Sequence, residues 1–326
     1  MADYDNTHRA FLQVFLSRGT LTYETAKPIL ASILTASEPD RETQPNDITS
    51  ELFSDYITSM NTAISPFDFE IRSTLPQAPY PSTTDSTTTS PNERVYALVN
   101  TTSDPITQLA TSHSPDEIAF LKRLLDAMFE TYNTRNAEIL ALTSLQALAL
   151  SRGPNTSSST QSDAPSAPTA SLTKAEAERC LESLVAEGWL DLSKKSYYRL
   201  SARALMELRT WLVETYNTGG GDGGSEDEDE DEDRVERVRF CHGCREIVIV
   251  GQRCVDLDCG VRMHDFCARN VLRAAGGKRC PACKKGWSGE VLVGEKAAGR
   301  RTSGAVNGRR SSGAVTNGVG NNEEDE

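Results

Sequence analysis

The sequence has 326 residues and a formal net charge of −13, with 37% hydrophobic and only 6% aromatic residues. That length allows two or three domains, and the low aromatic content indicates that part of the chain packs no core. No segment has the roughly 20 consecutive apolar residues of a membrane-spanning helix, and the first residues lack a signal-peptide pattern. We therefore expect a soluble protein that does not contact a membrane.

The negative charge is concentrated in two short tracts. Asp222 and residues 226–233 contribute nine acidic side chains, and residues 323–326 contribute four more. These thirteen charges account for the whole formal net charge, so the remaining chain is close to neutral. The acidity therefore says little about the folded parts.

Residues 1–104 have the pattern of a first winged-helix domain. Apolar residues recur at helical spacing in three segments. Two strand-like runs follow, and three helices followed by a hairpin is the order of a winged helix. Between the strands, the Ser-, Thr- and Pro-rich segment 73–92 is expected to be a disordered insertion. The expected helices lie around 11–16, 22–34 and 52–60, and the expected strands cover 67–71 and 95–99.

Residues 105–218 repeat this order with clearer signals. Ser114 and Thr173 each open a capping box, and Gly188 is expected to end the helix that begins after Thr173. On that helix, Cys180 lies on the apolar face, where a buried and inert thiol is expected. Further expected elements are a helix over 141–150, a disordered insertion over 153–170, strands over 189–192 and 197–200, and a last helix from Ser201.

If the second domain bound DNA, the helix over 173–187 would be the expected recognition helix. It carries two basic and four acidic side chains. Phosphates would repel this net negative charge, and neutralising phosphates dominates DNA affinity. We therefore favour protein contact here and expect direct DNA contact to be weak at most.

The remaining chain is expected to contain an acidic flexible linker (219–234), a zinc domain (235–290) and a disordered tail (291–326). Seven of the eight cysteines lie between Cys241 and Cys283. Close cysteine pairs in a chain without a secretory signal favour metal binding over disulfides.

Eight residues have the spacing C-x2-C-x9-C-x4-C-x4-H-x2-C-x12-C-x2-C. If the pairs alternate, as in a cross-brace, the eight residues form two four-ligand zinc sites with no open position. Closed sites of this kind are structural, so we expect zinc removal to unfold this segment while the winged helices stay folded. The two expected ligand sets are Cys241, Cys244, His264 and Cys267 for one ion, and Cys254, Cys259, Cys280 and Cys283 for the other.

The zinc segment resembles the variant RING of the family called non-structural maintenance of chromosomes element 1. The similarity rests on 251–254, 259–264, 279–283 and Trp287, while the run 94–100 is similar to that family's first wing. The resemblance covers about residues 5–287, apart from the two insertions that are expected to be disordered. The expected fold is thus multidomain and mainly α with small β wings: tandem winged-helix domains followed by a cross-brace, two-zinc variant RING.

The resemblance implies a nuclear, chromosome-associated subunit of the structural maintenance of chromosomes five/six complex, acting in DNA repair and recombination. It implies contact with the structural maintenance of chromosomes subunits, and a melanoma-antigen-type (MAGE) partner bound through the winged helices. It also implies a RING-type ubiquitin ligase. Such a ligase has no nucleophile of its own and positions the thioester carried by a ubiquitin-conjugating enzyme.

Three residues are expected at the surface that docks the conjugating enzyme: Gly243, Pro281 and Lys284. Pro281 and Lys284 match active RINGs, whereas Gly243 stands where many of them carry an apolar residue. Two interpretations follow. One is a weak, partner-dependent ligase, and the alternative is a non-catalytic, zinc-dependent scaffold subunit of the same complex.

Overall fold

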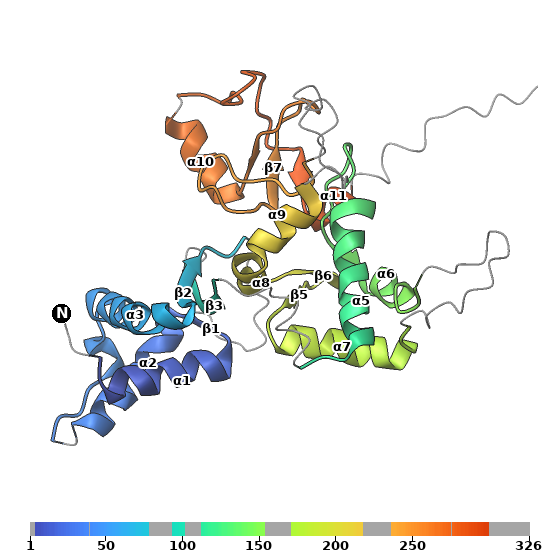
Figure 1. The fold of residues 1–326 in the computed structure, drawn as a ribbon. Coiled ribbons are helices and arrows are strands. Elements are labelled where there is room, and N and C mark those ends of the chain that lie inside the picture. Colours follow the sequence, from blue (N-terminus) through green and yellow to red (C-terminus); the bar gives the residue numbers. More distant parts are fainter. Residues whose placement is uncertain are drawn as a thin grey trace, which may run out of the picture.

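The computed structural model describes residues 4–38, 40–77, 93–101, 112–153, 171–217, 236–274 and 276–299. These residues form three units, each with a small three-stranded sheet, and the third unit contains the clustered cysteines (Figure 1). The expected acidic linker lies outside the described residues, as do 78–92, 154–170 and 300–326 of the other expected loose segments. No helix within the described ranges is long and apolar enough to cross a membrane.

The first unit packs three helices against a sheet of order β1-β3-β2. The apolar faces expected from the sequence form its core, in which Phe11, Leu30 and Met60 are fully buried. The short strand β1 was not predicted, because three residues are too few to show a period. The elements are α1 (Asn6–Arg18), β1 (Thr20–Thr22), α2 (Tyr23–Ser37), the 3-10 turn η1 (Pro45–Asp47), α3 (Ser50–Ile64), the 3-10 turn η2 (Ser65–Phe67), β2 (Phe69–Thr74) and β3 (Val95–Asn100).

The second unit has a sheet of order β4-β6-β5 and helices that begin where the capping signals predicted. Both capping boxes are confirmed, at Ser114 and at Thr173, and Gly188 ends its helix with φ 77°. The elements are α5 (Pro115–Asp126), the π turn η3 (Ala127–Thr131), β4 (Leu142–Thr143), α6 (Ser144–Ala149), α7 (Lys174–Ala186), β5 (Leu190–Leu192), β6 (Tyr197–Leu200), α8 (Ala202–Glu207) and α9 (Arg209–Asn217).

Two helices of the second unit differ from the prediction. The helix expected over 141–150 begins only at Ser144, because the two residues of β4 pair with Tyr198 and Tyr197 of β6. The single helix expected from Ser201 is divided at Leu208, whose ψ of 0° ends α8. The break lets α8 pack on the first unit while α9 runs toward the third (Figure 1).

The third unit contains a sheet of order β8-β7-β9 and the helix α10. Here the expected disordered tail, 291–326, starts too early: Val293 pairs with Gly251, and Ala297 is buried against the second unit. The expected insertion 73–92 also starts too early, because its first two residues belong to β2. The elements are β7 (Gly251–Arg253), β8 (Arg262–Met263), α10 (Asp265–Ala274), β9 (Leu292–Val293) and α11 (Glu295–Ala298).

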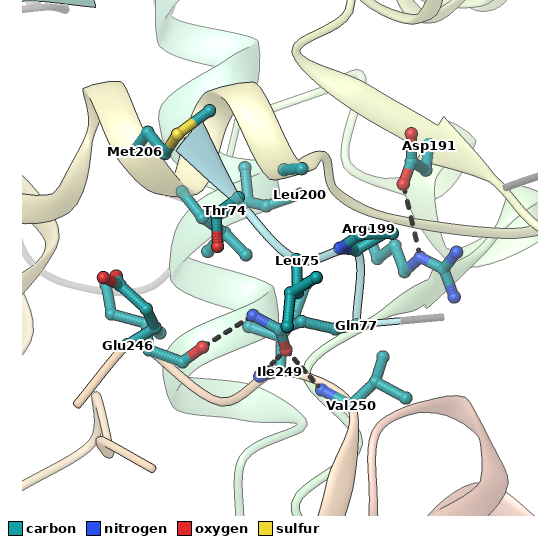
Figure 2. Close-up of a pocket in the computed structure, with 14 residues that line it drawn as sticks. Thr74, Leu75, Gln77, Asp191, Arg199, Leu200, Met206, Glu246, Ile249 and Val250 are labelled. Carbon is teal, nitrogen blue, oxygen red and sulfur yellow. Dashed lines mark hydrogen bonds and ion pairs between the residues drawn. The ribbon is translucent and has the colours of Figure 1, made fainter. Parts of the chain in front are cut away.

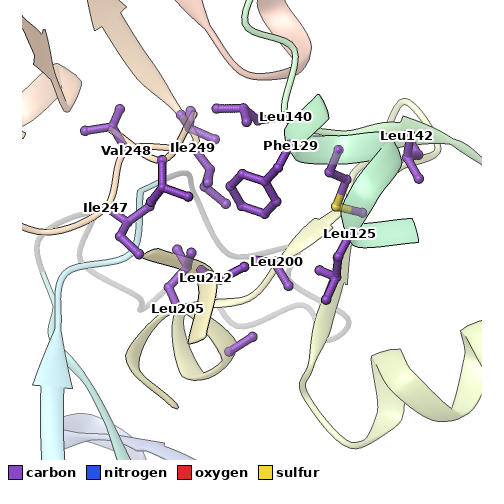
Figure 3. Close-up of a cluster of buried hydrophobic side chains, with 14 of the residues drawn as sticks. Leu125, Phe129, Leu140, Leu142, Leu200, Leu205, Leu212, Ile247, Val248 and Ile249 are labelled. Atoms are coloured by element: carbon purple, nitrogen blue, oxygen red, sulfur yellow. The ribbon is translucent and has the colours of Figure 1, made fainter. Parts of the chain in front are cut away.

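The second and third units share one hydrophobic core. Phe129 and Leu212 of the second unit belong to the same buried cluster as Ile247, Val248 and Ile249 of the third (Figure 3). These five side chains are at most 3% exposed. Since burying apolar surface is the main stabilising term in folding, the cysteine-rich unit depends on the second unit for part of its stability.

Candidate metal centre

The first cluster joins the start of the third unit to the β8–α10 junction. Cys241, Cys244, His264 and Cys267 each offer a ligand atom, and all four atoms lie within 4.8 Å of one another. The Nδ1 atom of His264 is 3.3 Å from Cys244 Sγ and 4.0 Å from Cys267 Sγ. Its Nε2 atom lies 3.3 Å from the Ile247 carbonyl oxygen, so a proton on Nε2 would be donated there when Nδ1 binds a metal.

The second cluster joins the end of β7 to the turn that carries Pro281. Cys254, Cys259, Cys280 and Cys283 again lie within 4.8 Å of one another at their sulfur atoms. The Sγ atoms of Cys254 and Cys283 are 3.4 Å apart, and those of Cys259 and Cys280 are 3.6 Å apart. Neutral thiols gain little from such close packing, whereas a shared cation draws thiolates together.

The β7–β8 ladder interleaves the two clusters. Because the strands are antiparallel, Cys254 follows β7 at one end of the ladder and His264 follows β8 at the other. Gly251 is required for this approach, since a Cβ atom there would collide with the carbonyl oxygen of Met263. The segments that follow β7 and β8 therefore contribute ligands to different clusters.

The two clusters fit zinc. Three cysteines with one histidine, and four cysteines, are donor sets typical of structural zinc sites. They are also the two sets that alternating pairs predicted, and together they are the ligand sets for two zinc ions in a RING-like domain. His242, between two ligands in the sequence, is exposed and belongs to neither cluster.

The thiols of the first cluster differ in acidity. Burial opposes ionisation of Cys241, but hydrogen bonds from the His264 side chain and from nearby backbone amides lower its pKa to about 5. Burial, and then the negative charges of Cys241 and Cys244, raise the pKa of Cys267 to about 12. Zinc must displace the proton of a thiol such as Cys267, so binding is coupled to proton release.

The three expected docking residues lie on the surface of the third unit to different extents. Gly243 is exposed, but a Cβ atom there would lie 3.1 Å from Cys267 Cβ and 3.3 Å from Val271 Cγ2. Pro281 is half-buried, and Lys284 is exposed with its Nζ donating to the Pro281 carbonyl oxygen at 2.7 Å. An apolar side chain at position 243 would thus have to displace part of α10.

An ion pair that sequence reasoning missed holds the ladder against the second unit. Glu138 lies in the loop before β4 and is buried between Arg253 of β7 and Arg262 of β8. Its partners are 115 and 124 residues further along the chain, so no local pattern signals the contact.

A second missed contact ties the first unit to the third. The Gln77 side chain donates to the Ile247 carbonyl oxygen at 2.6 Å and accepts from the backbone amides of Ile249 and Val250, at 2.9 and 3.1 Å (Figure 2). Behind these contacts, at the junction of the three units, lies a narrow cavity of about 20 Å³. The Gln77 side chain thus replaces a strand partner for the segment between Cys244 and β7.

An apolar groove of about 390 Å³ opens on the first unit. Two of its side chains are unusually exposed, Phe67 at 72% and Leu16 at 59%. Large exposed apolar groups gathered at one site mark an interaction surface. The groove is lined by Tyr4, Leu12, Leu16, Ala63, Ile64, Phe67, Phe69 and Leu98.

Comparisons with known proteins agree with this arrangement. Residues 8–208 match the family model described as the Nse1 non-SMC component of the SMC5-6 complex, and residues 241–283 match a RING-like domain. Relatives include the non-structural maintenance of chromosomes element 1 homologs of Homo sapiens and Xenopus tropicalis. The human relative is 22% identical over 88% of this chain and 85% of its own length. The frog relative is 23% identical over 89% and 86%.

A solved structure gives the same fold. A chain of an Nse1-Nse3-Nse4 complex superposes with a TM-score of 0.62 at 21% sequence identity, covering 89% of this chain and 100% of that one. The likeness therefore extends over both helical units and the RING-like unit.

Proposed function

This chain belongs to the family of Nse1 non-SMC components of the SMC5-6 complex, and from that membership we propose that it is the complex's RING-type ubiquitin ligase subunit. We further propose that its two helical units are winged helices and that its third unit is a cross-brace RING. In this role the protein acts in the nucleus, on chromosomes, in DNA repair and recombination. We propose that its partners in the complex include the structural maintenance of chromosomes subunits.

The closed metal clusters are the observation that carries the ligase proposal. Each cluster offers four donors, so a zinc ion held by all four would have no open position for a reacting group. A RING needs none, because its contribution is to hold the ubiquitin thioester of a conjugating enzyme in a reactive geometry. Pro281 and Lys284 would contact the conjugating enzyme and ubiquitin beside the second cluster.

Autoubiquitination with a panel of conjugating enzymes tests the ligase, in the presence and absence of the partner subunit. Product that appears with the partner, and is lost in a Cys280→Ser variant, is the expected result. A Lys284→Ala variant should keep the two zinc ions of the RING and lose part of the activity. No ubiquitin transfer under any condition would overturn the ligase proposal.

Gly243 favours the second candidate, a zinc-dependent scaffold subunit without catalysis. The position where many RINGs carry an apolar contact residue has no side chain here, and Cys267 and Val271 restrict the space above it. In the scaffold case the complex assembles and needs its zinc, yet no conjugating enzyme binds. The autoubiquitination assay separates the two candidates.

The partner subunit in our proposal is a MAGE-type protein that binds the apolar groove of the first unit. The matching solved structure is an Nse1-Nse3-Nse4 complex, in which that chain has two protein partners. The exposed Phe67 and Leu16 give this groove the large apolar contacts that dominate binding energy in protein interfaces.

Co-purification tests the groove. A Phe67→Asp, Leu16→Asp double variant should lose the MAGE-type partner, because each charge would be buried without a counter-ion. Leu145→Asp is the matched control, since Leu145 is 81% exposed on the second unit and lies outside the groove. Equal partner binding by the wild type and the double variant would place the interface elsewhere.

A further inference from the structure

A third group of metal-binding residue types lies outside the cysteine-rich unit. His113, Glu117 and Cys180 each offer a ligand atom within 4.8 Å of the other two, the spacing that also defines the two zinc clusters. His113 and Glu117 flank the start of α5, and Cys180 lies in the middle of α7. We propose that these three residues bind a third divalent metal ion of the zinc class, which links α5 to α7.

The spacing of the donors fits shared ligation better than direct hydrogen bonding. His113 Nδ1 lies 3.6 Å from Glu117 Oε2, which is too long for a good hydrogen bond. The nitrogen–sulfur separations in the first zinc cluster, 3.3 and 4.0 Å, bracket this distance. Glu117 Oε2 also accepts from the Ser114 amide at 2.8 Å, which holds the carboxylate in place and leaves this oxygen a second lone pair for a metal.

The other ring nitrogen of His113 is held as metal-binding histidines usually are. His113 Nε2 lies 3.0 Å from Glu187 Oε2, and Glu187 Oε1 accepts from the Ser183 hydroxyl at 2.7 Å. A carboxylate on one imidazole nitrogen fixes the tautomer and directs the lone pair of the other nitrogen toward the metal. Glu187 is thus a positioning residue, and Nδ1 is the ligand atom.

The donor types and their burial select the ion. An imidazole, a carboxylate and a thiolate suit Zn²⁺, and the two negative charges balance its charge. Cys180 is 2% exposed, whereas the Glu117 side chain is 32% exposed, so an ion enters from the carboxylate side. Three protein ligands leave one position for water, and we expect weaker binding than in the two closed clusters.

Metal content of the full chain tests the proposal. After equilibration with buffered Zn²⁺, wild-type protein should contain three zinc ions per chain. His113→Gln and Cys180→Ser should each contain two, while the control Glu178→Gln, on an exposed residue of α7, should keep three. Two ions in the wild type at saturating zinc would overturn the proposal, as would three ions in both ligand variants.

A second measurement does not depend on the folding of the variants. Titration of the metal-depleted wild type with Co²⁺ should saturate at three equivalents. The third and weakest should add a tetrahedral or five-coordinate spectrum with sulfur-to-cobalt charge transfer. Saturation at two equivalents would mean that His113 only pairs with the carboxylates of Glu117 and Glu187. That result would overturn the site whatever the variants do.

Discussion

Glu138 and Arg262 form a two-point contact that joins the second unit to the metal-binding unit. Arg262 Nε donates to Glu138 Oε2 at 2.7 Å and Nη2 donates to Oε1 at 2.5 Å, while Arg253 Nη1 donates to the same Oε1 at 2.9 Å. Burial alone would raise the pKa of Glu138, but the hydrogen bonds and charges of Arg262 and Arg253 lower it. The Glu138 carbonyl oxygen accepts from the Gly294 amide at 2.8 Å, so one residue contacts β7, β8 and the segment before α11.

Replacing Glu138 should therefore destabilise both units. Glu138→Ala leaves Arg253 and Arg262 buried without a counter-ion, and breaking a buried pair in this way costs about 3–5 kcal/mol. Denaturant unfolding followed by circular dichroism measures the loss. Glu236→Ala is the control, because Glu236 pairs with Arg239 on the surface and such pairs contribute about 0–1 kcal/mol. If both variants lost the same free energy of unfolding, Glu138 would not be the residue that holds the second and third units together.

Zinc removal should affect more than the cysteine-rich unit. The sequence alone led us to expect that the winged helices would stay folded after chelation. Because Phe129 and Leu212 share a core with Ile247 to Ile249, losing the zinc sites would expose apolar surface on the second unit. We now expect a strong chelator to shift amide NMR signals of α9 and of the π turn as well as those of the RING-like unit.

The first unit is the internal control for chelation. Its main core is a separate cluster around Phe11 and Met60, and it contains none of the zinc ligands. Its signals should keep their dispersion after zinc removal, apart from residues near Gln77. Unchanged signals in α9 would show that the second unit is stable without its neighbour.

Local signals in the sequence predicted local structure well. The capping boxes at Ser114 and Thr173 depend on residues three positions apart, and the two ligand sets depend on the spacing within the segment 241–283; the structure has both as predicted. The contacts between units could not be predicted in this way. Gln77 meets Ile247 across 170 residues, and Glu138 meets Arg262 across 124, so each looks like an ordinary surface residue in the sequence.

The ends of the expected disordered segments were wrong for the same reason. Residues 294–299 are mostly small or charged, and the apolar run 291–293 before them is too short to form a core, yet Val293 and Ala297 are buried by strand pairing and by contact with the second unit. Composition predicts whether a segment can form a core of its own. It does not predict whether the segment completes another core.

Gln77 should hold the first unit to the RING-like unit. Gln77→Ala removes three hydrogen bonds and leaves the backbone amides of Ile249 and Val250 without their acceptor. A net loss of about 1 kcal/mol per hydrogen bond corresponds to roughly fivefold faster amide exchange at each position. Hydrogen exchange measured by NMR at these two amides tests this.

A conservative variant separates the acceptor from the donor of Gln77. Gln77→Glu keeps an acceptor for both amides but places a carboxylate against the Ile247 carbonyl oxygen, which the native amide approaches at 2.6 Å. We expect its exchange rates to lie between those of the wild type and of Gln77→Ala. Wild-type exchange in Gln77→Ala would mean that the first unit is held mainly by α8.

The glycine at position 243 should resist conversion to an apolar docking residue. Gly243→Ile adds a Cβ atom 3.1 Å from Cys267 Cβ and further atoms beyond it, against a helix that carries a zinc ligand. Overpacking of this kind costs about 1–3 kcal/mol. We expect the variant to release zinc from the first cluster at lower chelator concentration than the wild type. Gly277→Ala is the matched control in the same unit, since nothing lies within 4 Å of an added Cβ atom there. If Gly243→Ile instead kept both zinc ions and gained ubiquitin transfer, the missing side chain rather than the space around it would limit activity.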